Sequence, residues 1–398
     1  MRTVREPLTS EISRAQPIGF TEADVDVEAL RSLTVQRSVV TDYPTAAAVE
    51  RGVVIYLANR LEVAARADRA SVLSELCHVL GHGPGVFVVR DAVPPETVAA
   101  ATRVFDDLIA AQRATGIGVG DHFAKAGAND RIWNSHEKLA VAAPEVFVDY
   151  YASTAIELAS LAWLGPGYQV TSQVNLVRPG GDAQSGHRDY HLGFMSDEQA
   201  KAFPRHVHVV SPYLTLQGAI AHSDMAVESG ATKLLPHSHK LPVGYLAWRH
   251  PDVIDLFESA CVQLPLSVGD ALFFNPALLH AAGANRTKDV MRMGNLLQVS
   301  SAMGRAMESV DRARIVRAIY PTLRQRVANG WDAASVDRVV AASAEGYAFP
   351  TNLDRDPAVG GLAPLSQADV LRSSLTAAWS ADELDTELTA AEFRRRPS

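Results

Sequence analysis

The sequence predicts a mainly β core, a sandwich or a barrel, with α-helical flanks on both sides. From about Tyr168 to Ser300, strand-like runs are separated by Pro-Gly, Ser-Gly and Asn-Arg turns. Helical periodicity is nearly absent from this segment apart from residues 197–202. Before and after it, apolar residues recur at helical spacing, so the helices are expected to pack around the β-rich part.

The region before the core is predicted to be an arm followed by helices. The first 40 or so residues mix charged residues, Pro and Thr, which is typical of an irregular arm. Helical periodicity follows across residues 46–69 and 70–80, and the second stretch ends at glycines, as helices often do. The apolar run Val86–Arg90 is predicted to be a strand, and Pro94-Pro95-Glu96 opens the next helix.

The region beyond Met303 is predicted to be helical again. Periodic stretches at residues 311–327 and 334–342 are followed by a Pro- and Gly-rich loop and by terminal amphipathic helices. The predicted division is an N-terminal arm with helices (1–75), a core domain (76–305) and a C-terminal helical extension packed on the core (306–398).

The composition argues against several classes of protein. Hydrophobic residues make up 47% and charged residues 21%, as in ordinary globular proteins, and the net charge of −8 gives no support for nucleic-acid binding. The N-terminus lacks the apolar core of a signal peptide, and the longest apolar stretch near it, Val53–Ala58, is too short to span a bilayer. Two cysteines, Cys77 and Cys261, provide no disulfide framework. We therefore expect a cytoplasmic protein with no membrane or nucleic-acid partner.

A candidate metal site lies in the β-rich segment, which holds nine of the 13 histidines. His187 and Asp189 are two residues apart, so on a strand both side chains point to the same face and converge on one cation. His280 follows 93 residues later in an apolar, strand-like run. Two histidines and one carboxylate form the facial triad of non-haem Fe(II) oxygenases, but zinc uses the same ligand types, so the triad alone does not decide the metal.

An iron enzyme that uses a 2-oxo acid also needs a cation for the distal carboxylate of that acid, preferably an arginine. Arg292 lies 12 residues after His280 on a returning strand-like segment, whereas Arg286 sits in the preceding turn and is expected to face solvent. Both remain open as the anchor. In the strand-like run 171–176, Thr171, Gln173 and Asn175 share one face, which lines the pocket or is exposed.

These motifs, in this order, resemble the phytanoyl-CoA dioxygenase family, whose members carry His-x-Asp, a distal His and an Arg eleven or twelve residues later. The opening strand and helix of the family are similar to Gly85–Leu108, and His237 stands where the family has glycine. The resemblance covers about 230 of the 398 residues. The matching motifs are Gly186–Tyr190, Val227–Ala231, Leu235–His239 and His280–Arg292.

The resemblance implies a double-stranded β-helix (a cupin-like jelly roll) with Fe(II) at one open end, and 2-oxoglutarate and O2 as co-substrates. Carried over, His187, Asp189 and His280 are the iron ligands, and Arg292 anchors 2-oxoglutarate. An Asn or Gln on the strand of residues 171–176 contacts the co-substrate, Asn175 first and then Gln173. The implied reaction is hydroxylation of an aliphatic C–H of a small-molecule or acyl substrate, with release of succinate and CO2.

Two positions bear on this resemblance. Ala282 stands where many relatives have Ser or Thr, so one hydroxyl contact to the co-substrate is missing. Asp189 keeps the carboxylate that halogenating relatives replace with a small residue, which favours hydroxylation.

Substrate contacts are predicted in the polar and aromatic stretch at residues 121–134, because loops of this kind often cover active sites. The candidates are Lys125, Arg131 and Trp133, and a purely structural loop is the alternative. Two other functions remain open for the chain. One is a cupin-like metal-dependent hydrolase or isomerase that adds His191 to the three ligands, and the other is a non-catalytic relative that binds 2-oxoglutarate.

Overall fold

The computed structural model describes residues 18–115, 128–358 and 360–397, and its strands form two sheets. The larger sheet has eight strands in the order β1-β2-β3-β9-β6-β11-β5-β4, and the smaller has three in the order β10-β7-β8. β2 and β3 run parallel, whereas the other neighbouring strands run antiparallel. The strands are β1 (Ala48–Glu50), β2 (Val53–Leu57), β3 (Val86–Arg90), β4 (Asn129–Ile132), β5 (Gln169–Val177), β6 (Thr215–Ala221), β7 (Lys233–Leu234), β8 (Val262–Gln263), β9 (Ala271–Phe274), β10 (His280–Ala281) and β11 (Arg292–Ser300).

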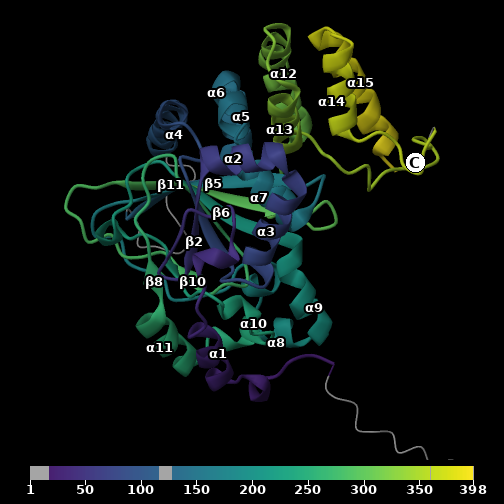
Figure 1. Cartoon of the computed structure of the whole chain (residues 1–398). Helices are drawn as coiled ribbons and strands as arrows, with labels where there is room; N and C mark the ends of the chain where they lie inside the picture. The colour runs from purple at the N-terminus through teal and green to yellow at the C-terminus, as the bar shows by residue number, and fades with distance from the viewer. Residues whose placement is uncertain (1–17, 116–127, 359, 398) are drawn as a thin grey trace, which may run out of the picture.

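In Figure 1, α4 to α6 and α12 to α15 lie at the top of the view and α1 and α8 to α11 at the bottom, with α2, α3 and α7 between them. In the described part of the chain, none of them combines the length and the apolar character needed to cross a membrane. The helices are α1 (Val27–Thr34), α2 (Ala58–Ala67), α3 (Arg69–Gly81), α4 (Pro95–Thr115), α5 (Ser135–Ala142), α6 (Pro144–Tyr151), α7 (Thr154–Leu164), α8 (Asp197–Lys201), α9 (Arg205–Val210), α10 (Gly244–Ala247), α11 (Pro251–Ala260), α12 (Arg312–Ala328), α13 (Ala333–Ser343), α14 (Gln367–Thr376) and α15 (Ala381–Arg395).

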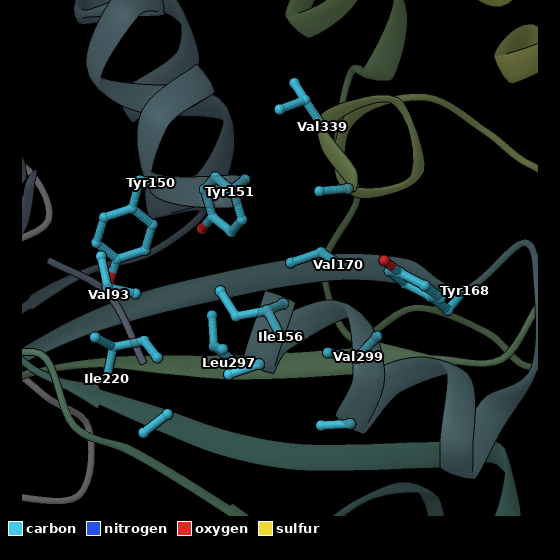
Figure 2. Packing of buried hydrophobic residues seen from close by; sticks show 14 of the residues in the cluster. Val93, Tyr150, Tyr151, Ile156, Tyr168, Val170, Ile220, Leu297, Val299 and Val339 are labelled. Atoms are coloured by element: carbon cyan, nitrogen blue, oxygen red, sulfur yellow. The ribbon is translucent and has the colours of Figure 1, made fainter. Parts of the chain in front are cut away.

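One face of the larger sheet forms the main hydrophobic core with α2 to α7 and α12 to α15. Figure 2 shows Val170, Ile220, Leu297 and Val299 on this face, with Tyr151 of α6 nearby. Successive side chains of a strand alternate between faces, so the neighbours of these residues point the other way. We call that opposite side the inner face.

The inner face divides into an apolar half and a polar half. On β2, β3 and β9 it carries Val53, Val86 and Phe274, which pack in one cluster with Leu234 of the smaller sheet. On β4, β5, β6 and β11 it is polar: the register pairs Gln217 with Gln298, Arg131 with Asn175, and Asn175 with Gly294. Paired residues share a face, so these polar side chains collect on one side of the sheet.

Several predicted elements are confirmed by the structure. The strand Val86–Arg90 is β3, the helix opened by Pro94-Pro95-Glu96 is α4, and the helix ending near Gly81 is α3. The two helices predicted after Met303 are α12 and α13.

The prediction of a helix across residues 46–57 was wrong, because this segment forms the hairpin β1–β2. Arg51 and Gly52 both have positive φ, at 50° and 82°, which is the requirement of the tight turn that joins antiparallel strands. Val53, Val54 and Ile55 are β-branched and buried, and β2 pairs in parallel with β3. The N-terminal region therefore adds two strands to the larger sheet.

The prediction that helices are nearly absent between residues 168 and 300 was also wrong. Besides α8, which was predicted, this segment contains α9, α10 and α11. α11 begins with Pro251 at its first position and buries Val253, Leu256 and Phe257 at helical spacing. The fold is therefore a mixed α/β fold with an eight-stranded sheet rather than a mainly β fold.

A buried polar chain joins α4 and α6 to the end of β6. The His222 ring lies 2.8 Å from Thr102 Oγ1 through Nδ1 and 2.8 Å from the Tyr150 hydroxyl through Nε2. Thr102 donates its own proton to Val98 O, so its oxygen accepts from Nδ1–H, and the Tyr150 hydroxyl donates to Nε2. A neutral histidine satisfies this chain, and burial lowers the pKa of His222 to about 3.

This histidine predicts a pH dependence of stability. An unfolded histidine titrates near pH 6.5, so between about pH 6.5 and 3 the unfolded state binds a proton at this residue and the folded state does not. The contribution of His222 to the stability of the fold is therefore complete above pH 6.5 and is lost as the pH falls. The free energy of unfolding is measured by urea titration at several pH values between about 6.5 and 5 and plotted against pH. His222→Gln should reduce the slope of this plot by up to about 1.4 kcal/mol per pH unit. The exposed His206→Gln should leave the slope unchanged, and an unaltered slope in His222→Gln would contradict the assignment.

Candidate metal centre

The structure brings the three predicted metal ligands, His187, Asp189 and His280, together beside the polar half of the inner face. Their ligand atoms all lie within 4.8 Å of one another. Nε2 of His280 is 3.3 Å from Asp189 Oδ2, and Nε2 of His187 is 3.6 Å from Asp189 Oδ1. In the described ranges, these three residues make up the set of His, Cys, Asp and Glu side chains close enough to hold a metal ion.

Backbone pairing places the two histidines side by side. The His187 N–H donates to His280 O at 3.0 Å, and the His280 N–H donates to His187 O at 3.1 Å. Residues that exchange both bonds in this way lie directly opposite each other, so their side chains leave the same face. The imidazole centroids are accordingly 4.5 Å apart, although 93 residues separate the two in the chain.

Hydrogen bonds behind each ligand orient it toward the centre. Nδ1 of His187 donates to Ser185 O and Nδ1 of His280 donates to Leu278 O, both at 2.9 Å. Because a carbonyl oxygen only accepts, each Nδ1 carries a proton, and Nε2 is the ring nitrogen that faces Asp189 and the centre. Two imidazole nitrogens and one carboxylate fit a divalent transition metal such as Fe(II).

The charge states of two ligands also suit a metal. Burial opposes ionisation of Asp189, but the hydrogen bond and charge of His280, with His187 and Gln217, outweigh it and hold its pKa well below the usual range. Burial, reinforced by His280, lowers the pKa of His187. At neutral pH this gives an ionised carboxylate and a neutral imidazole, the forms that bind metal.

The rear of the site is held by Arg188 and Ser238. Arg188 Nη2 donates to Ser238 O at 2.6 Å, and Ser238 Oγ accepts from the Leu279 N–H at 2.8 Å. One serine thus ties the His-x-Asp segment to the segment of the distal histidine. A Cβ at Gly244 would overlap the Arg188 guanidinium, so a side chain there would displace it.

His237 has φ +68°, a left-handed conformation that glycine, the family residue at this position, adopts without strain.

Arg292 is a buried cation on the inner face, at the start of β11. It donates through Nη1 to the Gly230 carbonyl, and no carboxylate pairs with it in the described parts of the chain. Burial, with the charge of Arg131, lowers its pKa to about 10, so it remains charged at neutral pH. A buried cation without a counter-anion is costly, so Arg292 suits an anionic ligand. Arg286 is exposed, as expected from its place in the turn.

The other predicted contacts also lie around the inner face. Asn175 is buried, with no partner for Oδ1 in the described residues, whereas Gln173 Oε1 accepts from Arg131 Nη1 at 2.7 Å. The Arg131 guanidinium lies 5.1 Å from the ring centroid of Trp133. The face of β5 that carries Gln173 and Asn175 is therefore buried rather than exposed. The remaining candidate, Lys125, falls outside the described residues.

His191 does not join the metal ligands. Its Nδ1 lies 3.2 Å from Ser211 Oγ, and the ligand group contains the other three residues alone among those described. The four-ligand site of the alternative hydrolase or isomerase is therefore not formed.

Gln217 is a supporting residue that the sequence analysis missed. Its Nε2 donates to Asp189 Oδ2 at 2.5 Å. Thr215 and Gln217 alternate along one strand, which indicates a polar face. This pattern does not predict that Asp189 lies opposite that face. The neighbouring Tyr190 and the distant Glu308, which are considered below, were missed as well.

Removal of Gln217 should weaken the metal site. Gln217→Ala deletes the donor that fixes Asp189 Oδ2, and loss of such a supporting partner typically costs 10–100-fold in metal affinity. Anaerobic equilibrium dialysis with Fe(II) measures this change. Gln263→Ala is the matched control, because that side chain donates to Ala231 O away from the ligands. Equal Fe(II) affinity in both variants would show that Gln217 does not orient Asp189.

The His-Asp-His centre lies beside the sheet face that carries the buried Arg292, and this combination is typical of non-haem iron, 2-oxoglutarate-dependent dioxygenases. Residues 81–294, more than half of the chain, match the phytanoyl-CoA dioxygenase (PhyH) family, and the chain belongs to this family. The matched range contains His187, Asp189, His280 and Arg292.

Curated relatives carry the same class name. Dioxygenase aneA of Aspergillus aculeatus is 29% identical over 163 residues, covering 39% of this chain and 49% of the relative. Dioxygenase cdmD of Talaromyces verruculosus is 31% identical over 157 residues, covering 39% and 46%. The matched segments thus span about half the length of these relatives.

Solved structures show similarity at lower identity. The non-haem α-ketoglutarate-dependent epimerase SnoN from nogalamycin biosynthesis is 19% identical with a TM-score of 0.38, covering 58% of this chain and 84% of that protein. AviO1 from Streptomyces viridochromogenes Tue57 is 20% identical with a TM-score of 0.41, covering 56% and 93%.

Proposed function

We propose that this protein hydroxylates an aliphatic C–H of a small-molecule or acyl substrate. The balanced reaction consumes substrate, 2-oxoglutarate and O2, and yields the hydroxylated product, succinate and CO2. One oxygen atom enters the product and the other enters succinate. The observation that carries this proposal is the buried Arg292, which has no carboxylate partner in the described parts of the chain and lies on the inner face beside the His-Asp-His centre. The two together match a metal and an anionic co-substrate.

Each residue then has a defined task. His187, Asp189 and His280 would hold Fe(II), which supplies the O2-dependent oxidation when bound. Arg292 binds the distal carboxylate of 2-oxoglutarate, and Asn175 and Gln173 contact the co-substrate.

The identity of the residue at Asp189 and the names of the relatives also support hydroxylation. Asp189 provides a carboxylate at the position where halogenating relatives have a small residue. The curated relatives aneA and cdmD are named dioxygenases. Substrate contacts are assigned to Arg131, Trp133 and Lys125.

The proposal extends to the organisation of the chain. We take the two sheets as the double-stranded β-helix of the family, with residues 76–305 as the catalytic domain. The described parts of the flanking regions 1–75 and 306–398 then pack around it, and β1 and β2 extend its larger sheet. The low cysteine content leads us to place the protein in the cytoplasm.

The test is an anaerobic titration of metal-free protein with Fe(II) and 2-oxoglutarate. We expect the weak visible charge-transfer band of a chelated 2-oxo acid, and slow succinate release once O2 is admitted. Absence of the band, together with tight Zn(II) binding, would overturn the oxygenase proposal in favour of a hydrolytic metal site.

A further inference from the structure

The polar half of the inner face has two chemically different ends. Arg292 pairs in register with Val177 at one end of β5, and Gln173 lies four residues away along that strand. At about 3.3 Å per residue, this separation is roughly 13 Å along the strand. Gln173 is close to Gln298, whose register partner Gln217 contacts Asp189. The Gln173 end is therefore the end at the level of the metal ligands, away from the anion site.

At the Gln173 end, several buried polar atoms have no hydrogen-bond partner within the described ranges. Native proteins leave few such atoms, and each requires an explanation. Thr215 and Gln217 share the inner face of β6, and Tyr190 directly follows the ligand Asp189. The unpartnered atoms are Tyr190 OH, Thr215 Oγ1, Gln217 Oε1 and Glu308 Oε2.

Glu308 supplies a carboxylate to this end from outside the segment that matches the family. It lies in the chain after β11, and its Oε1 accepts from the Asn134 N–H at 2.7 Å, just beyond β4, while Oε2 has no hydrogen-bond partner among the described residues. The Gln173 amide and the charge of Arg131 act to lower the pKa of this carboxyl group. Burial nevertheless raises the pKa of Glu308.

Tyr190 lies on the ligand side of the same end, directly after Asp189 in the chain. Its side chain is 2% exposed, and the charges of Asp189 and Glu308 add to burial in raising the pKa of its phenol. Tyr190 has φ +63° and ψ 145°, a region that non-glycine residues occupy only at a cost. Such strain is concentrated at functional sites, where it holds a side chain in a required direction.

We propose that this end binds the substrate through a hydroxyl group, which donates to Glu308 Oε2 and accepts from the Tyr190 hydroxyl. The inferred substrates are hydroxylated small molecules, and this assignment rests on the proposed oxygenase function. A carboxylate would be repelled by Glu308. An ammonium would satisfy Glu308 but would offer no acceptor to Tyr190, whereas a hydroxyl matches both groups.

The test uses the anaerobic Fe(II)–2-oxoglutarate complex and two probes, cis-1,2-cyclohexanediol and its dimethyl ether, measured by titration calorimetry. We expect the diol to bind at least about tenfold more tightly than the ether, because the ether cannot donate to Glu308. Glu308→Gln keeps the acceptor for Asn134, and it should weaken diol binding about tenfold without weakening ether binding. Tyr190→Phe keeps the ring but removes the donor to the oxygen of either probe, so it should weaken binding of both. Glu392→Gln, a surface carboxylate on α15, is the matched control and should behave as the wild type.

The outcomes separate this inference from the proposed function. Loss of the charge-transfer band in the wild type would overturn the oxygenase proposal before any probe is added. With the band present, equal or undetectable binding of diol and ether would overturn the hydroxyl assignment. An unchanged diol preference in Glu308→Gln, or tighter binding of cyclohexylmethylamine than of the diol, would also overturn it.

Discussion

Replacement of His187 by alanine should abolish formation of the Fe(II)–2-oxoglutarate complex. The variant loses one of three ligands in a centre whose ligand atoms lie within 4.8 Å, and no neighbouring side chain among the described residues replaces it. Loss of a partner behind a ligand already costs up to about 100-fold in metal affinity, so loss of the ligand itself should exceed that. The measurements are the visible charge-transfer band under anaerobic conditions and succinate release in air.

His191→Asn is the matched control for this prediction. His191 is four residues away and hydrogen-bonds to Ser211 instead of joining the ligands. It has φ +41°, a conformation that asparagine tolerates well, so the variant should fold. The control should retain the band. Loss of the band in both variants would instead restore His191 as a ligand and favour the four-ligand alternative.

Replacement of Arg292 should weaken 2-oxoglutarate binding strongly and leave metal binding nearly intact. Removing one partner of a buried, hydrogen-bonded charge pair costs about 2–5 kcal/mol, so we expect Arg292→Ala to raise the apparent Kd of 2-oxoglutarate about 30-fold or more. Arg292→Lys keeps the charge but not the bidentate geometry of the guanidinium, so its Kd for 2-oxoglutarate should lie between those of the alanine variant and the wild type. Titration of the anaerobic Fe(II) protein with 2-oxoglutarate measures the effect.

Arg286→Ala serves as the comparison, since both arginines follow the distal histidine and the sequence left the choice open. Arg286 is exposed, and its backbone N–H bonds to Glu228 O, so its side chain should be dispensable. Fe(II) dialysis and thermal unfolding of Arg292→Ala show whether the ligands and the fold persist without the guanidinium. A Kd that rises in Arg286→Ala and not in Arg292→Ala would reverse the assignment of the anchor.

The two ends of the inner face give the proposed reaction a direction. Arg292 offers a positive charge at one end, and the carboxyl group of Glu308 lies at the other end, level with the ligands. The distal carboxylate of the co-substrate is attracted to the first end. The second end is left for the substrate.

Local structure was predicted best where one element has one strong signal. The helix at α4 followed from its prolines and its apolar spacing, and β3 followed from a short apolar run. The hairpin β1–β2 was misread as helix, because an apolar run of this length is compatible with both structures. Pairing with β3 decided the outcome, and pairing is a long-range interaction.

The sequence by itself determined the candidate metal ligands. His187, Asp189 and His280 could be named because their types and spacing suit a metal, whereas the choice between Arg292 and Arg286 stayed open. Tertiary structure alone decided which further side chains surround the ligands. Gln217, Tyr190 and Glu308 come from separate segments, and only the packing of those segments around the sheet places them near the ligands. Strand periodicity reports which residues share a face, but what lies opposite that face depends on contacts between distant parts of the chain.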